Sequence, residues 1–248
     1  MSEILVGTND LRAGLISVVV HAFNDDRLPQ LNRVRLDIGP ERITITATDR
    51  WTAGLASVEI ITHLQAELEI IDIAPIDVQH ILKVFKCGKD KDDEPQYMLR
   101  IQTTDTHVTV TDASGLLDGH TLKVPRLATD EDFPNLPTYI HQTSNPLTVT
   151  RLGYTGKLLT RFNAAETCYG AMLVMEAATL DSRALTIRCG ENFIGRMTLT
   201  TITDSMNDQL IARREAWDER LPRPAGIDLK TATGLYSVSN IETEQDKP

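Results

Sequence analysis

One pattern of strands and a short helix occurs three times along the chain, and it constrains the fold more than any single motif. The helix position Leu15 recurs at Leu82, 67 residues later, and the strand position Ile43 recurs at Val108, 65 residues later. The next interval is 77 residues for both kinds of position. Agreement between helix and strand offsets is what a structural repeat predicts. With four strands to one helix in each copy, the sequence predicts an α+β fold with sheets on one side and helices on the other.

Alternation and helical periodicity place the elements of each copy. Ile43, Ile45 and Ala47 alternate with threonines, which is typical of a half-buried strand. The first helix carries an apolar stripe that includes Leu11 and Leu15. The expected elements are strands 3–8, 32–38, 42–48 and 54–61 with helix 11–23; strands 68–74, 97–103, 107–112 and 120–127 with helix 75–85; and strands 147–150, 171–177, 184–190 and 193–200 with helix 154–165.

Two segments resemble a known family. Residues 27–49 read RLPQLNRVRLDIGPERITITATD, with two alternating strands between turns, and residues 131–136 read EDFPNL. Together with the helix ahead of them, they resemble the first domain of the bacterial DNA polymerase III beta subunit, the sliding clamp. The resemblance implies a DNA-clamp fold of repeated β-α-β-β-β units with antiparallel sheets. It also implies that Asp49 and EDFPNL are framework residues that hold turns together.

The repeats divide the chain into three regions. We expect a clamp domain with two repeats at 1–140, a third repeat at 141–203, and a C-terminal helix and tail at 204–248. Ser205 followed by Asp208 resembles a capping box at the start of that helix. Trp217 is expected to pack on the third repeat, with a protein interface as the alternative. Residues 223–242 are expected to supply one or two short strands, and the end of the tail to be disordered.

Composition narrows the class of protein. Cys87, Cys168 and Cys189 show no paired spacing, and their odd number argues against a disulfide framework. No apolar run is long enough to cross a bilayer, and the N-terminus carries an acidic residue where a signal peptide would be basic. We therefore expect a reduced, cytoplasmic protein.

The distribution of charge favours a DNA partner despite a formal net charge of −10. Segments 11–24, 77–89 and 151–165 hold seven Lys or Arg and one Asp, a net charge of +6, which leaves −16 on the other 206 residues. Lysines on one solvated helix face would be routine, but three basic helices in an acidic chain fit helices that face phosphates. The candidate DNA-binding residues are Arg12, Gln79, Lys83, Lys86, Lys157, Arg161 and, from the family resemblance, Arg27.

Two of these arginines have alternative roles. Arg27 matches an arginine that the family places near DNA at the end of its first helix, but a pair with Asp25 or Asp26 is equally favoured. Arg12 is the only cation of the first helix, which Ile16 and Val20 make apolar nearly all round. That helix is therefore also consistent with a mostly buried position.

The resemblance also implies protein partners. In the family, the last strand carries a Met-Pro-Met-Arg-Leu pattern beside a pocket that captures short peptides from the DNA polymerase and the clamp loader. The matching strand here reads RMTLTT at 196–201, without the proline or the following arginine. Met197 and Leu199 remain candidates to line an apolar groove for such a peptide.

The resemblance further implies a ring. Rings of this family contain twelve repeats and the known bacterial chain carries six, so a chain with three resembles a shortened clamp of phage or mobile-element type. Three repeats per chain imply a homo-oligomeric ring of four chains, whereas three chains suffice if 205–248 forms a degenerate fourth repeat. The tail offers at most two strands where four are needed, which favours the tetramer over the trimer. An odd repeat number also implies self-complementary interfaces between neighbouring chains.

No catalytic or metal-binding pattern is found in the sequence. GYTGKLL at 153–159 lacks the first glycine and the Ser or Thr of a phosphate loop, and the six histidines never fall at ligand spacing. We therefore expect no catalysis, no metal and no cofactor. The interpretation is a processivity factor that encircles duplex DNA and tethers a polymerase. The alternative is a clamp-fold interaction module that does not encircle DNA and binds a replication or transcription partner.

Overall fold

The computed structural model describes residues 2–25, 27–65, 68–88, 90, 95–129, 132–141, 152–177 and 184–220. The chain divides into two compact units, Met1–Thr201 and Ile202–Pro248. The expected strand at 147–150, the expected strands at 223–242 and the side chain of Trp217 lie outside the described residues.

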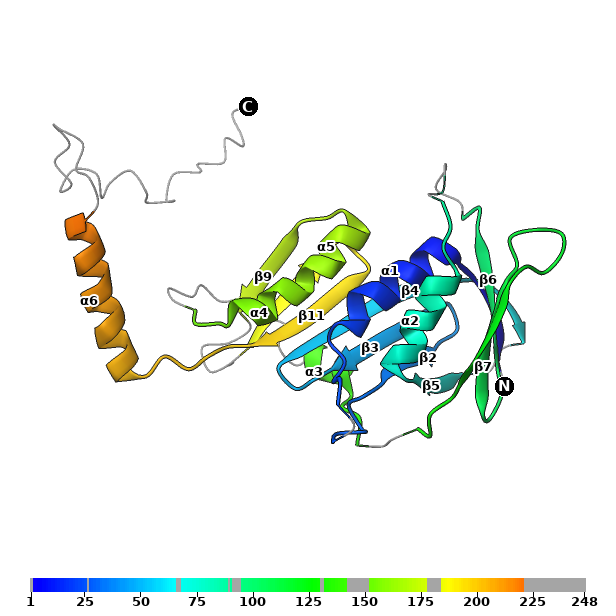
Figure 1. The fold of residues 1–248 in the computed structure, drawn as a ribbon, viewed down its shortest axis with the longest axis horizontal. Coiled ribbons are helices and arrows are strands. Elements are labelled where there is room, and N and C mark those ends of the chain that lie inside the picture. Colours follow the sequence, from blue (N-terminus) through cyan, green and yellow to red (C-terminus); the bar gives the residue numbers. More distant parts are fainter. Residues whose placement is uncertain are drawn as a thin grey trace, which may run out of the picture. The chain divides into compact units, whose positions relative to one another are not determined.

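Two copies of one set of elements and the described part of a third copy make up the first unit, and the predicted α+β fold is confirmed (Figure 1). In the first repeat these are β1 (Glu3–Gly7), α1 (Thr8–Val19), β2 (Val34–Ile38), β3 (Arg42–Thr48) and β4 (Thr52–Gln65). In the second they are β5 (Glu69–Ile73), α2 (Pro75–Val84), β6 (Met98–Thr103), β7 (His107–Asp112) and β8 (Thr121–Pro125). In the third they are α4 (Gly156–Leu159), the 3₁₀ turn η1 (Thr160–Phe162), α5 (Asn163–Tyr169), β9 (Leu173–Ala177), β10 (Ala184–Cys189) and β11 (Phe193–Thr198), and α3 (Leu136–His141) precedes this repeat.

The first two repeats exchange their first strands. β1 of the first repeat pairs with β6 of the second, and β5 of the second pairs with β2 of the first. All of these pairings are antiparallel, and the described strands form one sheet in the order β5-β2-β3-β4-β1-β6-β7-β8. A bridge between Asp72 and Leu127 joins β5 to the segment after β8. The two repeats therefore form a single domain rather than two independent ones.

The third repeat joins the sheet through the long strand β4. One edge of β4 pairs with β3, while its other edge pairs with β11 near its start and with β1 near its end. β10 then pairs with β11, and β9 pairs with β10. Because β4 pairs with β3 on one edge and with β11 on the other, the strands of the third repeat extend the sheet of the first repeat.

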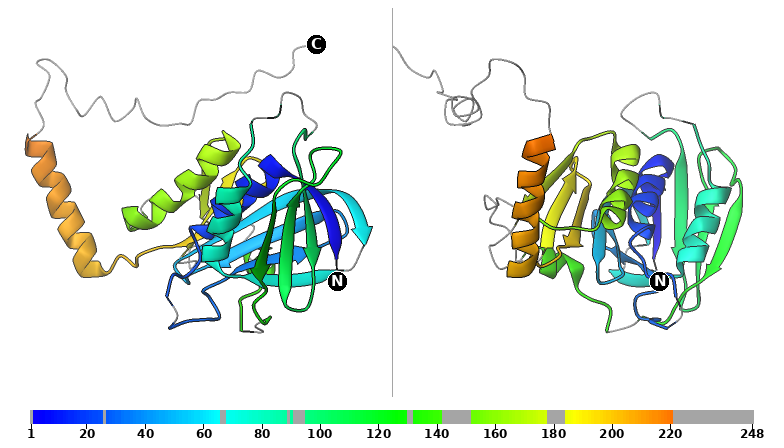
Figure 2. Two further views of the ribbon diagram at one scale, coloured as in Figure 1. Left: turned by 45° about the vertical axis from the view of Figure 1, so that its right-hand side comes forward. Right: turned by 60° about the vertical axis from the view of Figure 1, so that its left-hand side comes forward.

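The helices of all three repeats lie along the same face of the sheet, with α1 between α2 and α5 (Figures 1 and 2). The stripe of α1 is buried as predicted, with Leu11, Leu15 and Val18 at most 1% exposed. Gly14 lets this helix approach the sheet closely, because a Cβ atom there would lie 2.9 Å from side-chain atoms of both Ile45 and Val58. The sheet and the helix row thus share one hydrophobic core.

Helix boundaries differ from those expected, whereas strand positions agree closely. The first helix spans 8–19 rather than 11–23, because Gly7 already has the extended backbone of an N-cap residue. The third helical segment runs on to Tyr169 and ends at Gly170, which adopts φ of 62°. Alternation places the strand ends to within a residue or two, except that β4 runs to Gln65, four residues beyond the expected end at 61, whereas capping sets the ends of helices.

The second unit contains α6 (Asp204–Arg220). Its first turn is capped by Thr203, whose Oγ1 accepts a hydrogen bond from the Met206 backbone N–H at 3.3 Å. The cap is therefore Thr203 and not the predicted Ser205, since the helix begins two residues earlier than the capping box would place it.

Candidate functional site

Three of the candidate DNA-binding lysines are exposed on the helix side of the first unit. In α2, Val78 and Ile81 face the core, while Gln79 and Lys83 are exposed. Lys86 follows the end of α2, and Lys157 lies in α4; both are also exposed. The expected apolar and polar faces of these helices are thus present.

Arg12 instead connects two helices. Its Nη1 donates hydrogen bonds to the carbonyl oxygens of Leu82 at 2.6 Å and Phe85 at 2.8 Å. These carbonyls belong to the C-terminal end of α2, where a cation is favourable because the helix dipole is negative there. Arg12 therefore holds α1 against α2, in agreement with the interpretation that the first helix is mostly core.

Arg161 and Arg27 also have acidic partners within the chain. Arg161 Nη1 donates to Asp49 Oδ2 at 2.5 Å and to Thr52 Oγ1 at 2.6 Å, which ties the third repeat to the first. Arg27 pairs with Asp25 at 2.5 Å, and hydrogen bonds from Arg27 lower the pKa of that carboxyl. Of the two readings of Arg27, the ion pair is the arrangement in this structure.

The observed helix boundaries reduce the predicted positive charge of the helix side. The helices contain Arg12, Lys83, Lys157 and Arg161, and also the carboxylates of Asp10, Asp77 and Glu166. The excess of +6 depended on flanking residues, of which Lys89 and Arg151 lie outside the described part of the chain. The exposed lysines are therefore few, and among the described residues the helices carry nearly as many carboxylates as cations.

A tight turn between β3 and β4 builds one wall of a pocket. Asp49 Oδ1 accepts hydrogen bonds from the backbone N–H groups of Trp51 at 3.0 Å and Thr52 at 2.8 Å. These bonds allow Arg50 to adopt φ of 78°, a left-handed conformation that is uncommon outside glycine. Trp51 is left 60% exposed beside the pocket.

The EDFPNL segment builds the facing wall. Leu136 and Phe133 are buried and form a small cluster with Ala53 of β4. The guanidinium of Arg35 stacks over the Phe133 ring at 4.4 Å. α3 starts at Leu136, so these contacts hold Pro134 and α3 over the outer surface of β4.

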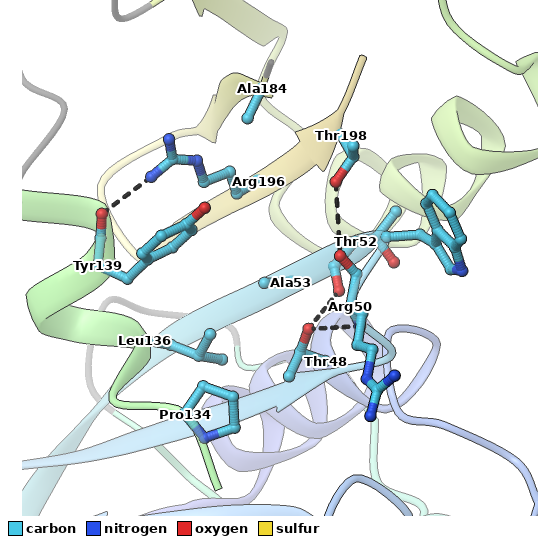
Figure 3. A pocket seen from close by; sticks show the side chains of 11 residues that line it. Thr48, Arg50, Thr52, Ala53, Pro134, Leu136, Tyr139, Ala184, Arg196 and Thr198 are labelled. Atoms are coloured by element: carbon cyan, nitrogen blue, oxygen red, sulfur yellow. Dashed lines mark hydrogen bonds between the residues drawn. The ribbon is translucent and has the colours of Figure 1, made fainter. Parts of the chain in front are cut away.

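The pocket between these walls has a volume of about 200 Å³. Figure 3 shows Arg196 and Tyr139 beside each other at one end, and Thr48, Arg50 and Thr198 at the other. The Arg196 guanidinium lies 4.1 Å from the centre of the Tyr139 ring and donates from Nη1 to the Tyr139 carbonyl at 2.9 Å. The lining residues are Thr48, Arg50, Trp51, Thr52, Ala53, Pro134, Leu136, Tyr139, Ala184, Arg196 and Thr198.

Met197 and Leu199 face away from this pocket. Side chains alternate along a strand, so Arg196 and Thr198 of β11 point into the pocket while Met197 points into the core, where it is fully buried. Leu199 packs against the same core. A peptide in the pocket would therefore contact Arg196 and Thr198, the neighbours of the two predicted residues.

Sequence reasoning missed Trp51, Tyr139 and Arg196. A signal for Trp51 was available, since this tryptophan lies two residues after Asp49, where the segment that resembles the family ends. The signal for Arg196 was the alternation of RMTLTT, which offers two faces and does not say which one is covered. Tyr139 carried no signal, because its role depends on where α3 packs.

Within the described ranges, no group of three or more His, Cys, Asp or Glu is arranged to hold a metal ion. No helix in that part of the chain is both long and apolar enough to span a bilayer.

Comparison with known proteins identifies the fold. No protein-family model and no curated protein matches the sequence. Solved structures do match: the DNA polymerase III beta subunit of Thermotoga maritima superimposes with a TM-score of 0.60 at 11% identity, over 84% of this chain and 67% of that one. The chain has the sliding-clamp fold.

Other solved clamps agree. The Bacillus subtilis sliding clamp matches with a TM-score of 0.59 at 12% identity, over 81% of this chain and 64% of its own. The Pseudomonas aeruginosa clamp bound to griselimycin matches with a TM-score of 0.55 at 14% identity, over 90% and 68%. The family resemblance of the sequence and its predicted clamp fold are confirmed, and the chain spans about two thirds of the length of these clamps.

Proposed function

We propose that the chain is a sliding-clamp-like processivity factor that encircles duplex DNA without reading its sequence and tethers a DNA polymerase. The observation that supports this best is the row of helices from three clamp-type repeats along one face of a continuous sheet, with Lys83 and Lys157 exposed on the helices and Lys86 exposed just after α2. Such a surface suits contacts to phosphates, which position a protein on DNA without specifying sequence.

A ring explains why a few exposed lysines suffice. A closed ring is retained on DNA by topology, so each chain needs only weak contacts that permit sliding. The acidic remainder of the chain limits adsorption of DNA to other surfaces. In this proposal four chains of three repeats each form the ring, as the resemblance implies.

The pocket between β4, β11 and α3 is the proposed site for the polymerase and, by the same means, a clamp loader. Its walls are largely apolar, and the side chains of Arg196 and Arg50 lie at its two ends (Figure 3). A volume of about 200 Å³ suits the side chains of a short peptide rather than a whole cofactor. Trp51 at 60% exposure is available to cover a bound peptide.

A double charge reversal tests the DNA interface. Lys83→Glu combined with Lys157→Glu should weaken binding to duplex DNA at least about tenfold and reduce the dependence on salt, which is about 0.9 log unit per log unit of salt for each phosphate contact. The matched control is Arg42→Glu with Lys123→Glu, an equal charge change at exposed positions of β3 and β8. Equal weakening by both pairs, or binding that ignores salt, would count against the helix face as the DNA interface.

A second candidate function also has structural support. Arg12 and Arg161 bind groups within the chain, which leaves fewer cations for DNA, whereas the pocket is fully formed. These facts favour a clamp-fold interaction module that holds a replication or transcription partner without encircling DNA. Partner binding that survives the lysine reversals, together with no measurable affinity for duplex, would favour this alternative.

A further inference from the structure

The first two repeats complete each other's cores through their exchanged strands. In the first repeat, Leu36 of β2 lies between Ile45 of β3 and Ile71 of β5. In the second, Ile101 of β6 occupies the same place between Val110 of β7 and Ile4 of β1. The central residues Leu36 and Ile101 are only 4% and 2% exposed. Each central residue is therefore covered by an isoleucine that the other repeat donates.

In each of the first two repeats, three apolar residues lie side by side across three strands. The third repeat has two of these residues but lacks the one that another repeat would donate. Met175 of β9 pairs in register with Ile187 of β10, which matches Leu36 with Ile45 and Ile101 with Val110. Ile187 is fully buried, yet Met175 is 43% exposed. Among the described residues, β9 pairs with β10 alone, and no strand lies on its other edge. The core of the third repeat is therefore uncovered at β9, whereas the cores of the other two repeats are covered at the equivalent strands.

The open edge of β9 lacks the features that protect an edge strand from pairing. Proteins commonly place lysine or proline on such edges; β8 carries Lys123 and Pro125, whereas β9 reads LVMEA. Its one charged residue, Glu176, already pairs with Arg188 at 3.1 Å. Met172, just before the strand, is 78% exposed. Apart from Glu176 the residues of β9 are apolar, and β9 is the last described strand on its side of the sheet (Figure 1).

We propose that the β9 edge of the third repeat binds the third repeat of a second copy of this chain, about a two-fold axis. The exchange between the first two repeats is reciprocal, since each repeat gives one strand and receives one. The described part of the chain has an odd number of repeats, so the β9 edge finds no equivalent edge within it. A second copy supplies the matching repeat, and a two-fold arrangement covers both open edges at once.

Joining two third repeats gives one more pair, so the described repeats of two chains form three pairs. The inference rests on strand register and burial and not on the proposed DNA contacts. The two-fold contact can therefore be absent even if the lysine reversals weaken DNA binding. It can also be present in a protein that never encircles DNA.

Sedimentation velocity and native mass spectrometry of the full chain test this proposal. The wild-type protein should form a dimer or a higher even-numbered assembly at micromolar concentration. Met175→Lys should raise the dissociation constant at least about tenfold, because it places a charge where the central core residue must be buried. Since Met175 is already 43% exposed in one chain, the variant should fold, which circular dichroism will show. The matched control is Leu64→Lys, at a residue of β4 that is 54% exposed.

Hydrogen exchange provides a second measurement that does not depend on a variant. The β9 amides that point away from β10 should become protected as the wild-type concentration rises. A wild-type protein that stays monomeric, an odd-numbered assembly, or assembly unchanged by Met175→Lys would each overturn the proposal. Protection of β9 in a monomer would do so too, because another part of the same chain would then cover the edge.

Discussion

His21 lies fully buried where the first and third repeats meet. Its ring packs 4.7 Å from that of Phe162 and 6.1 Å from that of Phe193, and neither ring nitrogen has a hydrogen-bond partner in the described residues. Burial, together with a smaller effect of the nearby Arg161 and against the opposing effect of Asp49, lowers the pKa of His21 to about 3. The folded protein therefore keeps this imidazole neutral.

A pH-dependent stability follows from His21. The pKa of His21 is lower in the folded chain than in the unfolded chain. Above pH 6.5 the imidazole is neutral in both states and does not reduce the unfolding free energy. As the pH falls from 6.5 toward 3, only the unfolded chain binds a proton, so the folded protein loses stability. Between pH 6.5 and 5 the wild-type protein should lose about 1.5 kcal/mol of unfolding free energy from this residue. Urea titrations of His21→Phe should show a smaller loss over that range. An unchanged pH dependence in the variant would show that His21 does not titrate in this way.

Arg161 is predicted to act on stability. Arg161→Ala leaves Asp49 Oδ2 without its cation in a site where the Asp49 side chain is only 9% exposed. Because Arg161 itself is 26% exposed, solvent offsets part of the loss, and we expect about 1–2 kcal/mol of destabilisation in thermal or urea unfolding. Lys157→Ala, at an exposed position one helical turn earlier, should change stability by less than about 0.5 kcal/mol. Equal effects of the two substitutions would contradict the structural role of Arg161.

At the scale of elements, the strands could be predicted because alternation of apolar and polar residues is local information. The repeat offsets even placed Ile43, Val108 and Leu185 at equivalent positions. The pocket could not be predicted, since its walls come from the 48–53, 134–139 and 196–198 segments, which meet only because β11 pairs with β4. The same pairing decides which face of β11 is buried. The sequence therefore could not show that Arg196, and not the predicted Met197, lines the pocket.

The pocket makes a prediction of its own. Short peptides with adjacent apolar residues should bind there and change the fluorescence of Trp51, one of only two tryptophans in the chain. Tyr139→Ala removes the ring beneath Arg196 and should weaken such binding at least about tenfold. Tyr154→Ala is the control, because Tyr154 is similarly exposed but does not line the pocket. Binding that responds equally to both substitutions would place the peptide elsewhere.

At the scale of the molecule, the three repeats in the described part of the chain leave the β9 edge of the third repeat open, and the proposed ring needs several chains. Self-complementary contacts at β9 would make neighbouring chains present opposite faces. The pockets of alternate chains would then lie on both sides of a ring, so a polymerase would find binding sites on either side. This differs from a ring with one distinctive face and follows from the odd number of repeats.

Particle images of the assembled protein test the central claim most directly. At micromolar concentration, class averages from electron microscopy should show a closed ring with four-fold repetition of the chain and a central hole wide enough for duplex DNA. The helix sides, with Lys83 and Lys157, should face the hole. Particles without a hole, or single chains at every concentration with and without duplex DNA, would contradict the account.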